Sequence, residues 1–339
     1  MPHIASIAGP VRRFVVEAYQ NIDTGGPEAM VQLALALDSL CPNATYLSKR
    51  PLNPRLTSEY PALLHLPQLA HDDLARGDLY LIPETCACDE QMVKRGVRQV
   101  VYMLSAKARR RNWQSIRKGC RLLSHNFWGA THTMAGFELS RHWVARPYIS
   151  PSIRRRCVGR PAAGAADGGA RRDLVLIDHD VEPEVEAAAR AACAATPGSE
   201  CVRVGSKAGA EHEEARTPRA EVQRLLAQAK VVVDWCLVGS ERLAIEAVLC
   251  GAVLLTSACK AGQEPRDFPL PRRHVLTHPA NLSAALPRVL RDLAHERRGY
   301  GPMVQLYAGL DAESLRAEVR QFLTAAGVTC APQGVVGQP

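Results

Sequence analysis

DLVLIDHD (173–180), a short apolar run that ends in acidic residues, is followed by EPEVEAAARAACAA (182–195), which has the apolar spacing of an amphipathic helix. This pair decides the fold, because the same alternation recurs along the rest of the chain. Further strand-like runs are CVRVGS (201–206), KVVVDW (230–235), AVLLTS (252–257) and HVLTH (274–278), and further helix-like stretches are 218–229, 240–251, 279–297 and 311–326. Short apolar runs separated by helices predict a parallel sheet with helical crossovers.

The first half of the chain alternates in the same way and predicts a second sheet. Its strand-like runs are 14–19, 44–48, 78–84, 99–105 and 121–126, and its helix-like stretches are 27–40, 88–96 and 107–119. Residues 151–172 are rich in Gly, Ala, Pro and Arg and have no apolar periodicity, which is typical of a linker or an exposed loop. We therefore expect one domain over 1–150, this linker, a second domain over 173–330 and a disordered tail over 331–339. The predicted fold class is α/β, with two Rossmann-like parallel-sheet domains that face each other across a cleft.

The length and composition agree with two globular domains. The chain has 339 residues, of which 47% are hydrophobic and 22% are charged, so disorder and a collagen-like structure are excluded for most of it. The net charge is 42 − 34 = +8. The basic residues stand in scattered doublets and triplets with few aromatic neighbours, so we expect no nucleic-acid partner. Solvated helix ends, or the attraction of an anionic substrate, would explain the excess charge.

The cysteines and the apolar runs bear on the compartment. Eleven cysteines are dispersed along the chain, several of them in apolar runs, which favours buried free thiols in a reducing compartment over disulfides. Cys86 and Cys88 form the only close pair, and the spacing of a zinc site is missing. No signal-peptide core and no membrane-spanning run is visible, so we expect a soluble, cytoplasmic protein.

The loops that follow strands are the places to search for a site, because ligands of open α/β sheets lie at the carboxyl ends of the strands. The first such loop contains Gly25, Gly26 and Pro27. Two glycines let the backbone approach a ligand closely, and free amides at the start of a helix attract anions. The alternative is a plain strand–helix turn.

A second candidate loop follows the strand that ends near Asp234. Gly239 and Ser240 precede a predicted helix that Ser240 would cap, with its first amides around a phosphate. Arg242 and Glu246 lie one turn apart on one helix face, where we expect them to face a solvated cleft and Glu246 to bind a ribose diol. The alternative is a surface Arg–Glu pair.

These two loops carry a family resemblance. GGPEAMVQLALAL (25–37) resembles the glycine-rich loop and helix of the N-domain of GT-B glycosyltransferases, and SERLAIEAVLCGAVLLTS (240–257) resembles their donor-binding segment. In that family a glutamate, here Glu246, binds the donor ribose and loop amides hold the diphosphate. The chain resembles the retaining, family-4-like enzymes of this fold. Its donor motif is degenerate, because Val238 stands where those enzymes have an earlier glutamate.

The resemblance implies a glycosyltransferase that moves a sugar from a nucleotide-sugar donor to an unknown acceptor. We expect no metal and no cofactor, because helix amides and basic side chains can stabilise the leaving diphosphate. His125 and Glu84, which end strands of the first domain, and Glu241, the acid nearest to Val238, are the candidate catalytic residues. Lys207 and Arg242 are candidates for gripping the diphosphate.

Three alternatives stay open. Asp178, His179 and Asp180 could bind a metal or cap the next helix. Asp178, Asp180, Asp234 and Thr256 also follow the order of acidic and hydroxyl residues in a phospho-acceptor receiver domain, which would make the second half regulatory or non-catalytic. A sugar-phosphate or nucleotide-sugar enzyme of the same architecture is the third.

Overall fold

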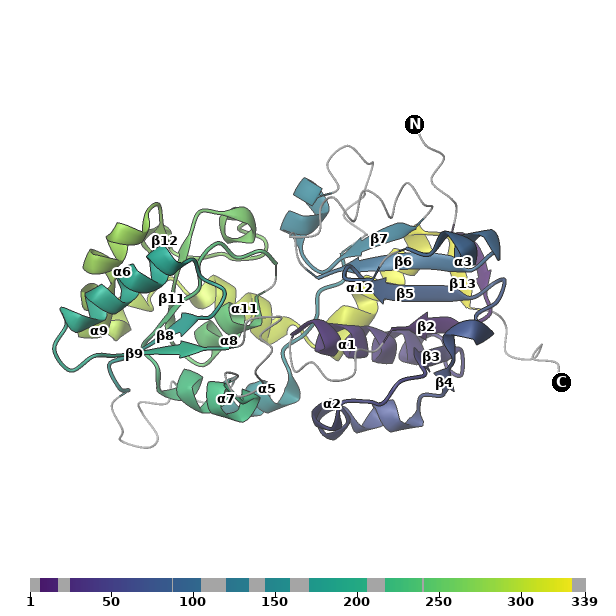
Figure 1. Ribbon diagram of the computed structural model, residues 1–339, viewed down its shortest axis with the longest axis horizontal. Helices are drawn as coiled ribbons and strands as arrows, with labels where there is room; N and C mark the ends of the chain where they lie inside the picture. Colours follow the sequence, from purple (N-terminus) through teal and green to yellow (C-terminus); the bar gives the residue numbers. More distant parts are fainter. Residues whose placement is uncertain are drawn as a thin grey trace. The chain divides into compact units, whose positions relative to one another are not determined.

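The computed structural model describes residues 7–17, 25–86, 88–104, 120–133, 144–158, 171–205, 217–239 and 241–330. The chain forms two compact units. The first unit comprises Met1–Tyr148 together with Leu310–Pro339, and the second unit comprises Ile149–Gly309. Figure 1 follows the chain through both.

The first unit is built on a six-stranded parallel sheet. Its strands are β2 (Phe14–Val16), β3 (Thr45–Ser48), β4 (Gln68–Leu69), β5 (Leu79–Pro83), β6 (Arg98–Met103) and β7 (Arg121–Ser124). Their order is β4-β3-β2-β5-β6-β7, which is the Rossmann order 3-2-1-4-5-6 when the strands are counted along the chain. The strands we expected in this half are therefore confirmed.

The residues of β2 explain why the sheet is buried on both faces. Phe14 and Val16 belong to one buried apolar cluster, and Val15 belongs to another on the opposite face. Successive residues of a strand point to opposite faces, so an uninterrupted apolar run is suited to a sheet that is covered on both sides. The helices in the described part of this unit are α1 (Gly25–Leu40), α2 (Pro54–Glu59), α3 (Glu90–Lys94) and α12 (Ala312–Ala325).

The C-terminal helix lies in the first unit, so our assignment of 311–326 to the second domain is wrong. Helix α12 packs against α1 (Figure 1), where Leu315, Val319 and Phe322 enter the cluster that contains Phe14. The Arg146 guanidinium donates to Glu318 of α12 at 2.7 Å. A short parallel pair follows, in which β13 (Val328–Cys330) lies beside β1 (Gly9–Val11).

The second unit is built on a five-stranded parallel sheet. Its strands are β8 (Leu174–Asp178), β9 (Glu200–Val204), β10 (Val231–Val233), β11 (Val253–Ser257) and β12 (Val275–Leu276). Counted along the chain, their order is 2-1-3-4-5, the flavodoxin-like order. Its helices are α5 (Pro151–Cys157), α6 (Pro183–Ala194), α7 (Arg219–Gln228), α8 (Arg242–Leu249), α9 (Leu282–Arg291), α10 (Leu293–Glu296) and α11 (Gly301–Gly309). The predicted strands of this half are confirmed.

Short helical turns complete the two units: η1 (Pro61–His65), η2 (His71–Asp73), η4 (Gly129–Thr133), η7 (Lys260–Gln263), η8 (Arg272–His274) and η9 (Pro279–Asn281). The start of the predicted linker forms α5, with Ile153 fully buried, so 151–157 is not a loop. The remainder of the predicted linker from 159 to 170, the basic helix predicted over 107–119 and the tail 331–339 lie outside the described residues. No described helix is both long enough and apolar enough to cross a membrane.

The expectation of free thiols is wrong, because ten of the eleven cysteines are paired in five disulfides. The pairs are Cys41–Cys330, Cys88–Cys120, Cys157–Cys250, Cys193–Cys201 and Cys236–Cys259, and Cys86 is in no disulfide. Each pair joins two residues of the same unit. The cysteines therefore do not indicate a reducing compartment.

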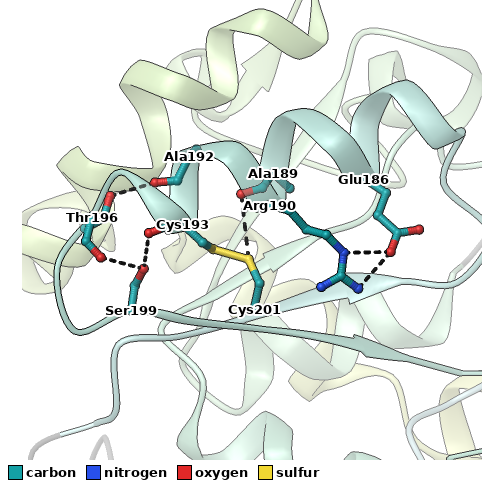
Figure 2. Close-up of a disulfide and its surroundings, with 8 residues drawn as sticks. All are labelled: Glu186, Ala189, Arg190, Ala192, Cys193, Thr196, Ser199 and Cys201. Atoms are coloured by element: carbon teal, nitrogen blue, oxygen red, sulfur yellow. Dashed lines mark hydrogen bonds and ion pairs between the residues drawn. A yellow bond between two sulfur atoms is a disulfide. The ribbon is translucent and has the colours of Figure 1, made fainter.

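Figure 2 shows how one of these disulfides fixes a turn of the second unit. Cys193, in the last turn of α6, is bonded to Cys201 in β9. Between them, the Ser199 hydroxyl donates to the Cys193 and Thr196 carbonyl oxygens, each at 2.9 Å. The cross-link and these two bonds hold the carboxyl end of the helix beside the strand that follows it.

The pairing predicts how many thiols react with an alkylating reagent. Under denaturing, non-reducing conditions we expect one label per chain, on Cys86, and eleven labels after reduction, as measured by intact mass. Cys86→Ser is the control and should take up no label before reduction. More than one label on the unreduced wild-type chain would contradict the pairing.

Candidate functional site

The strand orders mark where each unit can bind a ligand. The order reverses between β2 and β5 in the first unit and between β8 and β10 in the second. In open α/β sheets the crevice outside the carboxyl ends of the strands at such a reversal is the usual ligand site.

At the reversal in the second unit, His179 follows the end of β8 between two carboxylates. Its Nδ1 lies 3.2 Å from Asp178 Oδ1, and its Nε2 lies 3.1 Å from Asp180 Oδ1. Desolvation acts to lower the pKa of His179, but the hydrogen bonds and the charges of the two carboxylates outweigh it and raise the pKa to about 9. The ring packs against Gly205, where a Cβ would lie 2.3 Å from Nδ1. His179 is therefore a fixed cation at this edge of the sheet.

The loop after β10 is joined to the loop after β11. Cys236, in the left-handed backbone region at φ 57°, forms the disulfide with Cys259. The Cys236 N–H donates to Ser257 Oγ at 3.0 Å, and the Ala261 N–H donates to the Leu237 carbonyl oxygen at 2.9 Å. These links hold the chain that leads into α8.

Helix α8 begins at Arg242, with Glu241 in the N-cap position. Gly239 is buried just before it, and Ser240, which we expected to cap the helix, lies outside the described residues, as does Lys207. The expected Arg242–Glu246 pair is present, with Arg242 3.3 Å from Glu246 Oε1.

The expectation that Glu246 faces a solvated cleft is wrong, because its side chain is fully buried. Its Oε1 also accepts a hydrogen bond from Arg219, the first residue of α7, which the sequence analysis missed. Its Oε2 has no hydrogen-bond partner among the described residues. We call Glu246, Arg219 and Arg242 the Glu246 cluster. Both arginines start a helix that follows a strand, so the cluster lies toward the carboxyl ends of the strands.

In the first unit the predicted residues Gly26, Glu84 and His125 lie around the end of β6. The Leu104 N–H donates to Glu84 Oε2 at 2.6 Å, and a Cβ on Gly26 would lie 3.3 Å from Leu104 Cδ1. His125 Nδ1 lies 2.5 Å from the Met103 carbonyl oxygen. Gly25 is the first residue of α1.

Burial decides the charge of His125. Its ring is inside the unit, and this burial lowers its pKa to about 4, against the opposing effect of its bond to Met103. The imidazole is therefore neutral at pH 7, and its Nδ1 is the donor to the carbonyl oxygen. A role for His125, Glu84 or Glu241 in catalysis stays a prediction.

Glu17, directly after β2, is a second residue that was not predicted from the sequence. It is buried, its carboxylate accepts a hydrogen bond from the Tyr80 hydroxyl, and its Oε1 lies 3.0 Å from Arg50 Nε. Burial and the Glu17 charge raise the pKa of Tyr80. The signal was the acid that ends the apolar run FVVE (14–17), at the strand reversal of the first unit. Among the described residues, no group of three or more His, Cys, Asp or Glu side chains is arranged to hold a metal ion.

The raised pKa of His179 predicts a pH-dependent stability. The folded pKa of about 9 exceeds the unfolded value of about 6.5, so the contribution is complete below pH ~6.5 and is lost as the pH rises through 9. We expect the free energy of unfolding of the wild type to fall by up to about 3 kcal/mol relative to His179→Gln between pH 6.5 and 9.5, measured by urea unfolding.

The exposed His278 provides the matched control, since His278→Gln exchanges the same two residue types but leaves His179 and its two carboxylates in place. Parallel profiles for the wild type and His179→Gln would show that His179 is not the titrating group.

The sequence matches no model of a protein family and no curated protein. The structure is nevertheless similar to solved structures. HepE from Anabaena, in complex with UDP and glucose, aligns with a TM-score of 0.58 at 13% identity over 92% of this chain and 100% of that one. AviGT4, a glycosyltransferase involved in avilamycin A biosynthesis, aligns with a TM-score of 0.50 at 16% identity over 93% of this chain and 97% of that one. TarM from S. aureus aligns with a TM-score of 0.50 at 10% identity over 73% and 56% of the two chains.

All three have the GT-B fold, and AviGT4 is a glycosyltransferase. The likeness to HepE and AviGT4 extends over both units, each with its own parallel sheet. The chain therefore has the GT-B fold.

Proposed function

We propose that this protein transfers a sugar from a UDP-sugar donor to an acceptor, with the donor bound by the second unit. The observation that carries the proposal is the Glu246 cluster, in which one fully buried carboxylate holds the arginines that begin two helices. The complex of HepE with UDP and glucose supports the choice of a UDP-sugar.

The charges of the cluster suit a diphosphate. Two guanidiniums and one carboxylate leave an excess of one positive charge, and the side chains of Arg219 and Arg242 are 18% and 19% exposed. A cation at the start of a helix is unfavourable, because the helix dipole already makes that end positive. An anion at the same place would reverse this effect, since it would accept from both the amides and the guanidiniums.

Glu246 is suited to the ribose of the same donor. A ribose diol offers two O–H donors, and Glu246 Oε2 is a buried acceptor that lacks a partner among the described residues. We propose that Arg242 turns from Glu246 toward the diphosphate when the donor binds, which opens the carboxylate to the diol.

Transfer then breaks the bond between the sugar C1 and the diphosphate oxygen, and forms a bond between C1 and an acceptor oxygen. The nucleoside diphosphate leaves with the electron pair, and its terminal phosphate oxygen takes up the proton that the acceptor hydroxyl loses. Amides from Gly239 to Glu241, together with Arg242, would stabilise the leaving group without a metal. We propose that the first unit binds the acceptor and that Glu84 or His125 is its catalytic residue. We propose that Glu241 acts at the donor site of the second unit.

The Glu246 cluster predicts the effect of its variants on UDP affinity. A hydrogen bond to a charged group contributes about 1.5–3 kcal/mol, so Arg219→Ala, Arg242→Ala and Glu246→Gln should each weaken UDP binding about 10- to 100-fold in calorimetric titrations. The loss in the two arginine variants should be larger at low salt.

Arg190→Ala removes an exposed arginine that pairs with Glu186 on α6, and it serves as the matched control with wild-type affinity. Thermal unfolding must show that each variant is folded. If folded Arg219→Ala and Arg242→Ala bind UDP as tightly as Arg190→Ala, the proposed donor site is wrong.

The strand order of the second unit also favours a second candidate, a receiver-like domain, because receivers share the order 2-1-3-4-5. Asp178 and Asp180 both form ion pairs with His179. Among the described residues, no three His, Cys, Asp or Glu side chains are grouped so that they could bind a metal ion. We therefore expect acetyl phosphate with Mg²⁺ to add no phosphoryl group, as measured by intact mass. A phosphoryl adduct that Asp234→Ala abolishes would instead establish the receiver-like function.

A further inference from the structure

A pocket of about 520 Å³ lies beside the edge strand of the second unit. One wall is the chain from Arg272 to Thr277, which contains β12. The other wall is a single helical face, on which Asn281, Ala284 and Arg288 have the spacing of residues that lie one above the other. The lining residues include none of the Glu246 cluster, so this pocket is independent of the proposed donor site.

The pocket carries an excess of positive charge. Arg272, Arg273 and Arg288 line it, and Glu296 is the acid that pairs with Arg273 and Arg288. Three guanidiniums and one carboxylate leave 3 − 1 = +2 at neutral pH. Burial lowers the pKa of His274, which also contacts Glu296, so this ring adds no charge.

Two of the arginines are held in place. Glu296 is 3% exposed, and its two oxygens lie 2.9 Å from Arg273 Nε and 3.0 Å from Arg288 Nε. A terminal nitrogen of Arg273 also donates to three backbone carbonyl oxygens between residues 295 and 298. Because these side chains are already ordered, they would lose little additional rotamer freedom when a ligand binds.

All three arginines are exposed, but Arg272 differs from the other two because it forms no ion pair within the described part of the chain. The remaining wall is mixed, with Ala284 and Leu276 as apolar surface and Thr277 and Asn281 as polar groups. The volume falls within the range of small-molecule sites, about 300–1,000 Å³.

From this geometry we infer that the pocket binds a small organic phosphate. Its phosphoryl group lies against Arg272 and Arg288, and its apolar part lies against Ala284 and Leu276. Guanidinium groups match the oxygens of a phosphate and can bind it through two parallel hydrogen bonds. The proposal does not depend on the glycosyltransferase function.

The test uses phenyl phosphate and inorganic phosphate as probes in calorimetric titrations of the full chain. Phenyl phosphate should bind more tightly than inorganic phosphate, because its ring covers the apolar wall. Arg272→Glu and Ala284→Phe should each weaken phenyl phosphate binding by at least about tenfold, the first by charge and the second by filling the pocket. Both side chains are exposed, so neither change removes a core contact.

Arg190→Ala is the control and should bind phenyl phosphate as the wild type does. Arg242→Ala tells the two sites apart, since it changes the Glu246 cluster and should keep the phenyl phosphate site that Arg272→Glu removes. The inference is overturned if the wild type fails to bind phenyl phosphate at millimolar concentration. It is also overturned if Arg272→Glu and Ala284→Phe bind normally, or if Arg242→Ala abolishes binding, which would move the ligand to the Glu246 cluster.

Discussion

Parallel strands can be joined only by a crossover that returns over a face of the sheet, and the rest of this structure depends on that constraint. Each crossover leaves a strand at its carboxyl end, so the starts of α7 and α8 lie toward the same edge as the ends of the preceding strands. His179 and Asp234 follow two neighbouring strands at the strand reversal of the second unit for this reason. The Glu246 cluster needs the same arrangement, because Arg219 and Glu246 come from different helices.

The sheets could be predicted because strands buried on both faces appear as apolar runs, and FVV (14–16) alone contributes to two apolar clusters. The place of α12 could not be predicted in this way. The spacing of Leu315, Val319 and Phe322 indicates that one helix face is buried, but it does not indicate which element covers that face. The disulfides were missed for a related reason. A cysteine in an apolar run has the same sequence context whether its thiol is free or disulfide-bonded. The spacing gives no signal either, because Cys41 and Cys330 are 289 residues apart in the sequence.

The candidate site could be predicted only in so far as its contacts are local. The Arg242–Glu246 pair follows from a spacing of four residues on one helix, and it is present. Arg219 could not be assigned to the pair, because it begins a different helix and is 27 residues away from Glu246 in the sequence. The burial of Glu246 likewise depends on how α7 and α8 pack. This packing decides whether the Arg242–Glu246 pair lies on the surface or has a buried carboxylate.

The second unit uses one arrangement twice: a buried glutamate between two arginines from different elements. Glu246 holds Arg219 and Arg242, and Glu296 holds Arg273 and Arg288. A buried ion pair is a weak source of stability, since the cost of removing its charges from water offsets most of their attraction. Stability alone therefore gives little reason to bury either carboxylate. Each glutamate instead fixes two guanidiniums and leaves an unneutralised positive charge at a partly exposed position, and that is the electrostatic requirement of a preorganised anion site.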